Sequence, residues 1–179
     1  MAKILLVNNK DKEIGFEEKL KVHKLGLLHR AFSILIFNNQ GELLIQKRAK
    51  NKYHSNGLWS NTCCSHQGPK EPLGETIHRR LKEEIGIDCQ LRHVFDFSYE
   101  VKFANGLIEN EIDHVFIGVS TERPKINPKE VSDYRYLTLS NLKKDIKLNP
   151  EIYTEWFKII INKHFWRMKK SIQFFECPE

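Results

Sequence analysis

Two glutamates, Glu109 and Glu111, flank one asparagine in the stretch "LIENEIDHVFIGV". On a β-strand, residues two apart point to the same face, so the two carboxylates would lie side by side. The same face would carry Leu107, Val115 and Ile117, which indicates that it is at least partly buried. Two buried like charges repel and raise a pKa unless a cation or solvent relieves them. The pair therefore predicts a metal ion or a shared proton, whereas on an exposed strand it would be an ordinary polar face.

Residues 61–66 read "NTCCSH" and place two adjacent cysteines, Cys63 and Cys64, just before His66. Neighbouring cysteines rarely form a disulfide, because the bond favours Cα atoms about 4.4–6.8 Å apart with converging side chains. The sequence also lacks the C-x-x-C spacing of a zinc ribbon or a thioredoxin-type site. The cluster remains open to two interpretations, half of a metal site or a nucleophile beside its base, and the cysteines fit a reducing compartment.

Histidines are a second source of metal ligands, at His23, His29, His66 and His114. A lone histidine is more often a packed or surface residue than a ligand. Imidazoles together with carboxylates would suit a divalent transition metal with mixed nitrogen and oxygen ligands. The spacing along the chain does not by itself bring these histidines to one ion.

The segment "GETIHRRLKEEIG" (74–86) predicts a helix with one apolar stripe and a glycine at its end. Its charged residues form i,i+4 pairs such as Arg80 with Glu84, which alone would make a solvated face. The pattern R-x-x-E-E-x-G also resembles the second half of the Nudix box, which binds Mg²⁺ and diphosphate. In that box a glutamate follows the arginine, whereas here Arg80 follows Arg79. The resemblance therefore indicates a Nudix-like fold more than Nudix hydrolysis.

The elements that must position these residues alternate between hairpins and helices. Segment 30–48 predicts two strands around an Asn-Asn-Gln-Gly turn, and 93–103 and 107–120 predict a longer hairpin around Asn105-Gly106. A loop over 50–58 leads into a short extended segment, residues 134–139 predict a further strand, and Pro150 suits the first position of a C-terminal helix. We expect an α+β fold with a mixed sheet flanked by helices, an α/β/α sandwich, in one domain over residues 1–179.

The composition narrows the class of partner. Of 179 residues, 40% are apolar, which is enough for a real core, and the net charge of +6 suits an anionic partner. The chain shows neither a signal peptide nor a transmembrane segment, so we expect a cytoplasmic protein without a membrane partner. The basic residues do not cluster into one stripe, so a nucleic-acid partner is the interpretation that ranks last.

Four segments occur in an informative order, "EKLKVHKLGLLHRAFSILIFN", "GLWSNTCCSH", "RRLKEEIGI" and "NGLIENEIDHVF". Together they resemble type 1 isopentenyl-diphosphate Δ-isomerase over residues 1 to about 165. Each motif is moderate evidence, but the ordered set is highly specific. The chain departs from the family pattern at Gln67 and at Lys70-Glu71, which puts only the role of Glu71 in doubt. The tail "SIQFFECPE" has no counterpart.

The resemblance implies a role for each of a set of residues. It implies a metal held by His23, His29, His66, Glu109 and Glu111, with Mg²⁺, Mn²⁺ or Zn²⁺ as candidates. It implies that Lys19, Arg48, Lys52 and Arg80 bind a diphosphate, with Mg²⁺ on that diphosphate held by Glu84. The catalytic residues that it implies are Cys64, Glu111, Tyr99 and Trp156.

The implied reaction converts isopentenyl diphosphate into dimethylallyl diphosphate through a carbocation-like intermediate. Protonating an unactivated alkene requires a strong acid in a site closed to water. We expect Glu111, near Tyr99, to deliver that proton, and Cys64 to remove another as the thiolate. Trp156 would face the cation, although without the resemblance it would be an ordinary core residue, as would Tyr99. The alternative is a Nudix-type hydrolase of a nucleotide or prenyl diphosphate; a monomer and a homodimer are both compatible with the sequence.

Overall fold

Strand β3 (His29–Phe37) runs through the middle of the sheet and is buried at all but one position. Its sequence is almost continuously apolar, as expected for a strand that is covered on both faces. β8 (Ile108–Val119) pairs with it in parallel along one edge, over its full length. The other edge therefore receives β1 (Lys3–Val7), β6 (Cys63–His66) and β4 (Glu42–Arg48), all antiparallel.

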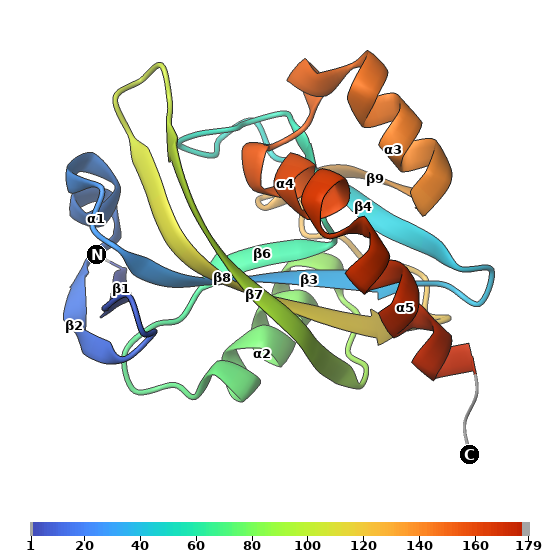
Figure 1. Cartoon of the computed structure of the whole chain (residues 1–179), viewed down its shortest axis with the longest axis horizontal. Coiled ribbons are helices and arrows are strands. Elements are labelled where there is room, and N and C mark those ends of the chain that lie inside the picture. The colour runs from blue at the N-terminus through green and yellow to red at the C-terminus, as the bar shows by residue number, and fades with distance from the viewer. Residues whose placement is uncertain (1, 177–179) are drawn as a thin grey trace.

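The structure is a computed structural model that describes residues 2–176, and Figure 1 shows how the elements lie around the sheet. Within that range nine strands form one mixed sheet, to which β2 (Glu13–Glu18), β5 (Trp59–Ser60), β7 (Leu91–Lys102) and β9 (Val131–Thr138) also belong. The helices are α1 (Lys19–Leu25), α2 (Leu73–Ile85), α3 (Leu139–Leu148), α4 (Glu155–Lys163) and α5 (Phe165–Glu176). None of the helices in this range is long and apolar enough to cross a membrane.

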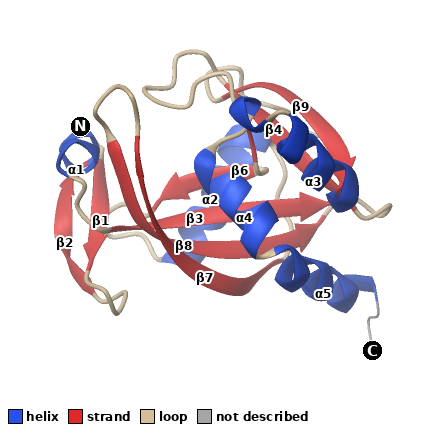
Figure 2. Cartoon of the chain, turned by 45° about the horizontal axis from the view of Figure 1, so that its top comes forward, coloured by secondary structure: helices blue, strands red, loops and turns tan. Residues whose placement is uncertain are grey.

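Helices cover both faces of the sheet, as Figure 2 shows for α2 and α4. On one face, the predicted apolar stripe of α2 packs against the sheet and forms a core with Phe32, Ile34 and Cys63. On the other face, residues of α3, α4 and α5 form a second core with Leu35 and Val115. The prediction of an α+β fold with helices on both sides of a mixed sheet is confirmed.

The two predicted hairpins are present, and glycines in the left-handed region make their turns. Gly41 has φ 71° between β3 and β4, and Gly106 has φ 81° between β7 and β8. An L-residue with a side chain is disfavoured at such angles, which is why glycine appears there. Strands β1 and β2 and helices α1 and α3 had no counterpart in the sequence prediction.

The predicted helix start at Pro150 is wrong. Pro150–Ile152 forms a single 3₁₀ turn (η1), and α4 begins only at Glu155. Between the two, the Thr154 N–H donates to the carbonyl of Trp59 at 3.0 Å, and Tyr153 forms a β-bridge with Trp59. This pairing needs extended backbone, so the helix cannot pass through it. Cys177 and the end of the C-terminal tail lie outside the described residues.

Candidate active site

One pocket between α1, the sheet, α2 and α4 is lined by most of the residues singled out in the sequence. From that set it contains the four predicted phosphate-binding cations, all the predicted catalytic residues and four of the six predicted metal ligands, with Glu111 belonging to both of the last two groups. They are Lys19, Arg48, Lys52, Arg80, Cys64, Tyr99, Trp156, His66, Glu84, Glu109 and Glu111. His23 and His29 lie next to it, with ring centroids 5.3 Å and 5.0 Å from that of His66. Segments far apart in the chain therefore converge on one cavity.

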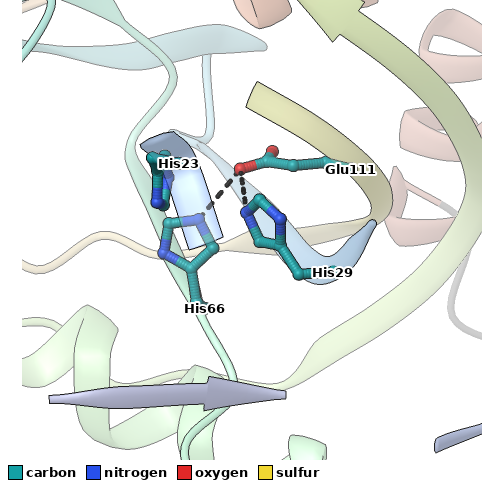
Figure 3. A group of neighbouring side chains, drawn as sticks. All are labelled: His23, His29, His66 and Glu111. Carbon is teal, nitrogen blue, oxygen red and sulfur yellow. Dashed lines mark hydrogen bonds and ion pairs between the residues drawn. The ribbon is translucent and has the colours of Figure 1, made fainter. Parts of the chain in front are cut away.

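His23, His29, His66 and Glu111 form a compact group whose ligand atoms all lie within 4.8 Å of one another. Figure 3 shows Glu111 pointing one carboxylate oxygen toward two of the rings. Glu111 Oε1 is 3.1 Å from His29 Nε2 and 2.9 Å from His66 Nε2. The four side chains come from α1, β3, β6 and β8, so the group forms only when the tertiary fold is complete.

Strand register explains why these side chains meet. Glu111 is paired with His29 across the parallel β3–β8 ladder and with Tyr99 across the antiparallel β7–β8 ladder. His66 is paired with Ala31, two residues beyond His29 on β3, and thus points to the same side of the sheet. A one-residue slip of any of these strands would send its functional side chain to the opposite face.

The fourth member, His23, depends on the end of helix α1. Gly26 closes the helix in the left-handed conformation, with φ 62°, and a Cβ there would lie 3.1 Å from Ile108. Glycine therefore allows the chain to turn sharply at the end of α1, so that this end of the helix packs closely against β8. This contact places the His23 ring 4.9 Å, centroid to centroid, from that of His29.

The donor set fits a divalent metal ion. His23 Nδ1 lies 2.7 Å from the carbonyl oxygen of Lys19, and His29 Nδ1 lies 2.8 Å from that of Leu27. A carbonyl oxygen only accepts, so each Nδ1 carries the proton and each Nε2 of the neutral ring presents a lone pair. A neutral His29 ring would thus turn its Nε2 lone pair toward a carboxylate oxygen of Glu111. Two acceptors in contact repel, so the contact calls for either a metal ion or a proton on Nε2 between them.

Burial of the rings supports this interpretation. It lowers the pKa of His23 to about 4 and holds the pKa of His66 well below its ordinary value. Both rings are therefore neutral at physiological pH, which is the state in which imidazole binds a metal. The carbonyl contacts of His23 and His29 are also the kind of outer contact that orients metal-binding histidines.

Glu109 and Glu111 are joined by one hydroxyl. The Tyr99 hydroxyl lies 2.6 Å from Glu111 Oε2 and 3.0 Å from Glu109 Oε2. Burial and the charge of Glu111 raise the pKa of Glu109 well above its usual range. Burial alone would raise the pKa of Glu111 too, but the contacts with His29 and His66 hold that pKa well below its usual range. The shared proton predicted from the sequence is therefore best placed on Glu109.

The two cysteines have different surroundings because they alternate along β6. Cys63 is fully buried in the core beneath α2, whereas Cys64 lines the pocket. Burial raises the pKa of the Cys64 thiol to about 11, although Arg48, whose Nη1 lies 3.7 Å from Sγ, favours the thiolate. The thiol is thus the main form at neutral pH, and the thiolate that would act as a base is a minor form.

Trp156 lies in the first turn of α4 and is almost fully buried. Its indole N–H donates to Asn61 Oδ1 at 3.1 Å, which fixes the orientation of the ring. The Arg48 guanidinium lies 5.2 Å from the ring centroid, so the ring already contacts one cation. The structure thus gives Trp156 a fixed place at the wall of the pocket.

The predicted phosphate-binding cations are near carboxylates. Arg80 pairs with Glu84 on the same helix, Lys52 pairs with Glu130, and Arg80 Nη2 is 3.7 Å from Glu130. Glu84 is buried and also accepts from Gln46 Nε2 at 3.2 Å. Positive and negative groups thus alternate at this end of the pocket, as a metal–diphosphate ligand would require.

Sequence reasoning missed four residues of the pocket or its rim. Tyr53 donates to His23 Nε2 at 3.2 Å, and His54 Nε2 lies 3.2 Å from Glu109 Oε1. Asp113 is buried and accepts a hydrogen bond from the Ser33 hydroxyl. Glu130 forms an ion pair with Lys52. Sequence signals existed for three of the four. Tyr53-His54 directly follows Lys52, which places this pair near the pocket without indicating what it contacts. Asp113 also continues the alternation of Glu109 and Glu111 on β8.

Comparison with known proteins agrees with the geometry. Residues 27–157 match the NUDIX domain. The chain is 51% identical to isopentenyl-diphosphate Delta-isomerase 2 of Photorhabdus laumondii, over 89% of this chain and 90% of that protein. It is 43% identical to the isopentenyl-diphosphate Delta-isomerase of Pectobacterium atrosepticum, over 97% and 98% of the two chains. The chain belongs to the isopentenyl-diphosphate Delta-isomerase family.

Solved structures place this isomerase family member in the wider Nudix fold. The DR0079 protein of Deinococcus radiodurans superposes with a TM-score of 0.74, at 18% identity, over 90% of this chain and 98% of that one. A MutT protein from Methanosarcina mazei superposes with a TM-score of 0.65, at 23% identity, over 80% and 96%. At these identities the likeness shows the fold alone, and the alternative of a Nudix-type hydrolase is not favoured.

Proposed function

We propose that this chain isomerises isopentenyl diphosphate to dimethylallyl diphosphate by adding one proton and removing another. The observation that carries the proposal is the placement of two proton-exchanging groups around one pocket. Glu109, Tyr99 and Glu111 reach it from β7 and β8, along one edge of β3, and Cys64 reaches it from β6, along the other edge. A hydrolase has no need of such a pair.

The proton that enters the alkene comes from the group of Glu109, Tyr99 and Glu111. Glu109, with its raised pKa, holds a proton in a buried site, and the Tyr99 hydroxyl connects it to Glu111. Because Glu111 is ionised at rest, Glu109 passes its proton to the Tyr99 oxygen while the Tyr99 hydroxyl proton moves to Glu111, which then delivers it to the alkene. Protonation of the terminal alkene carbon leaves a tertiary carbocation, which needs a site that excludes water.

Cys64 removes the second proton, from the carbon on the diphosphate side of the cation. The thiolate is the reacting form, and Arg48 beside Sγ stabilises it against the effect of burial. The Trp156 ring, held by Asn61, stabilises the cation between the two proton transfers. A cation–π contact of this kind is worth about 2 kcal/mol when desolvated.

The diphosphate lies toward the four cations of the pocket, Lys19, Arg48, Lys52 and Arg80. Arginine suits bidentate contact with phosphate, and lysine acts as a compact point charge. Glu84, whose buried carboxylate lines the same end of the pocket, would hold Mg²⁺ on the diphosphate. Glu130 must give up Lys52 when the diphosphate binds.

A divalent metal, Mg²⁺, Mn²⁺ or Zn²⁺, would be held by His23, His29, His66 and Glu111. Glu109 would be a further carboxylate ligand in its ionised form. When bound, such an ion fixes the carboxylates and makes Glu111 and its partners more acidic. Three imidazoles with carboxylates favour a transition metal over Mg²⁺ at this site. The residues of the chain fix the tautomers and the orientation of the rings beforehand, through Lys19 and Leu27.

The decisive experiment follows the product of isopentenyl diphosphate and Mg²⁺ in D₂O by NMR. Dimethylallyl diphosphate that carries deuterium is expected, and released phosphate without isomer would instead indicate a hydrolase. Cys64→Ala is expected to abolish turnover, while the matched Cys63→Ala is expected to retain it, because Cys63 packs in the core. Equal losses in the two variants would overturn the roles assigned here.

The proposed function also bears on the domain organisation, the partners, the location and the oligomeric state of the chain. We propose that residues 1–179 act as one catalytic domain on a small diphosphate substrate, without nucleic acid or membrane as a partner. A cytoplasmic location is the one in which free thiols such as Cys64 persist. Monomer and homodimer both suit the proposal, because the described residues of one chain supply every group that it uses.

A further inference from the structure

A second cluster of possible metal ligands lies on the opposite face of strand β8. His93 and Asp96 of β7 and His114 of β8 place ligand atoms within 4.8 Å of one another. Asp96 Oδ1 lies 2.6 Å from His93 Nε2 and 2.9 Å from His114 Nδ1. Residues 109, 111 and 113 of β8 point to the active-site pocket, so the alternation of the strand turns His114 away from it. The reaction proposed above uses none of these three residues.

A β-bulge builds this cluster. His93 and Asp96 are three apart, and on a regular strand they would point to opposite faces. The register between β7 and β8 shifts at Val94, and both Val94 and Phe95 pack against the same hydrophobic core. The extra residue therefore returns His93 to the face that carries Asp96. Bulges often re-aim a side chain in this way at functional positions.

His114 also has the outer contact that a metal-binding histidine needs. Its Nδ1 faces Asp96, while its other nitrogen, Nε2, lies 2.9 Å from Asp11 Oδ2. Asp11 is fixed in turn by Arg30, whose Nε donates to Oδ1 at 2.9 Å and whose Nη2 donates to the Asp11 carbonyl. When Asp11 accepts the Nε2 proton, Nδ1 is left with a lone pair toward Asp96. In metal sites, a carboxylate commonly accepts the proton of the ring nitrogen that does not bind the metal, and so orients the histidine.

We propose that His93, Asp96 and His114 bind a divalent transition metal such as Zn²⁺ on the outer face of the β7–β8 hairpin. Two imidazoles and one carboxylate are ligands that Zn²⁺ prefers over Mg²⁺, and three protein ligands leave further positions for water. The His93 and Asp96 side chains are 45% and 44% exposed, so the ion would exchange freely with solvent. The competing account is an ion-pair network in which a protonated His114 bridges two aspartates.

The test counts ions on the full chain with Co²⁺ as the probe, by equilibrium dialysis at neutral pH and visible absorption. The expected result is two ions per native chain, one in the active site and one on the hairpin. His93→Ala and Asp96→Asn each are expected to bind one ion and to keep isomerase activity. His78→Ala is the matched control, because His78 forms a similar exposed pair with Asp88, at 2.6 Å, and is expected to leave two ions.

The outcomes separate the two accounts. A native chain that binds one ion, or a second ion that survives both His93→Ala and Asp96→Asn, would overturn the proposal in favour of the ion-pair network. A second ion with a thiolate-to-cobalt charge-transfer band would be bound by cysteine and would overturn it equally. Because the hairpin residues lie outside the pocket, failure of this site would leave the isomerase proposal intact.

Discussion

Glu111 has contacts on both carboxylate oxygens, and this determines what surrounds it. Oε1 contacts His29 and His66, and Oε2 contacts the hydroxyl of Tyr99. The oxygen that faces the two histidines suits a metal. The oxygen that faces Tyr99 is connected through the hydroxyl to Glu109, whose raised pKa favours its protonated form. One carboxylate thus joins the candidate metal ligands to the hydroxyl that contacts Glu109. At the scale of single residues, the chemistry depends on which groups carry protons at rest.

The ionisation of Cys64 gives a direct test of its role as base. Burial raises the pKa of this thiol to about 11, so the thiolate is a minor species at neutral pH. If the thiolate removes the proton, kcat rises with pH, by roughly tenfold per pH unit while the thiolate remains scarce. Steady-state kinetics over the neutral and mildly alkaline range measure this slope. A kcat that falls with pH would mean that Cys64 gives a proton rather than takes one.

Lys19 should control substrate affinity through its own titration. Burial and the charges of Lys52 and Arg48 lower its pKa to about 8. The ammonium is therefore present below that pH and is lost as the pH rises through it, so KM is expected to rise above pH 8. Lys19→Arg stays charged and is expected to keep KM level over the same range. If the KM profiles of the two proteins coincide, Lys19 does not bind the diphosphate through its charge.

His54 is expected to hold Glu109 in place. Its Nε2 contacts Glu109 Oε1, its Nδ1 contacts Ser55, and its ring stacks on Phe103 with centroids 4.9 Å apart. His54→Ala removes a contact to a carboxyl group and should lower kcat/KM by roughly 10- to 100-fold, the equivalent of about 1.4–2.7 kcal/mol. His54→Gln, which retains a donor, should recover part of the loss. Equal losses in both variants would indicate a packing role only.

At the scale of elements, helix α2 carries Arg80 and Glu84 and ends at Gly86, which has φ 73°. A Cβ at this position would lie 2.8 Å from both Cβ and the carbonyl oxygen of Lys125. Gly86→Ala therefore combines left-handed strain with a clash and is expected to cost about 2–4 kcal/mol of unfolding free energy. Urea denaturation measures this cost through the midpoint.

The matched control for Gly86 is Gly41, in the β3–β4 turn. It has a similar φ of 71°, but a Cβ there would meet nothing within 4 Å. Gly41→Ala should therefore show the conformational strain alone, about 1–2 kcal/mol. If the two alanine variants are equally stable, the contact with Lys125 does not limit this position.

Local elements were predictable where a short-range signal exists. The Asn105-Gly106 turn, the apolar stripe of α2 and the glycine that ends it all act within a few residues. The break before α4 was not predictable, because it depends on the pairing of Tyr153 with Trp59, far away in the sequence. Strand β1 was missed for a similar reason, since its place beside β3 is a long-range pairing.

The candidate site shows the same division. Glu109 and Glu111 could be paired from the two-residue period of a strand, and their burial from the apolar neighbours. His23, His29 and His66 come close to these glutamates only through strand pairing and the packing of α1. Before the structure, only the family resemblance indicated that they belong to the same site. His54 belongs to a loop without periodicity, and nothing local indicates that it reaches Glu109.

At the scale of the whole molecule, the candidate metal ligands His23, His29, His66 and Glu111 bring together segments from residue 23 to residue 111. A ligand that binds only the folded state stabilises it by mass action, by about 4 kcal/mol at a thousandfold excess over Kd. For a chain of this size, that corresponds to a rise in Tm of roughly 8–16 °C. Strong chelation is therefore expected to lower Tm by a shift of this order and to abolish activity.

The chelated chain should nevertheless stay folded, because the two hydrophobic cores on either side of the sheet do not involve the metal ligands. Readdition of Zn²⁺, Mn²⁺ or Mg²⁺ one at a time, followed by Tm and activity, would then identify the ion that restores both. His66→Ala is the control, since it removes one ligand of the group and leaves the hairpin cluster intact. Chelation should shift its Tm far less than that of the native chain. A full shift in this variant would mean that the stabilising ion is bound elsewhere, because the active-site group spans four elements and cannot hold an ion equally well with one of them detached.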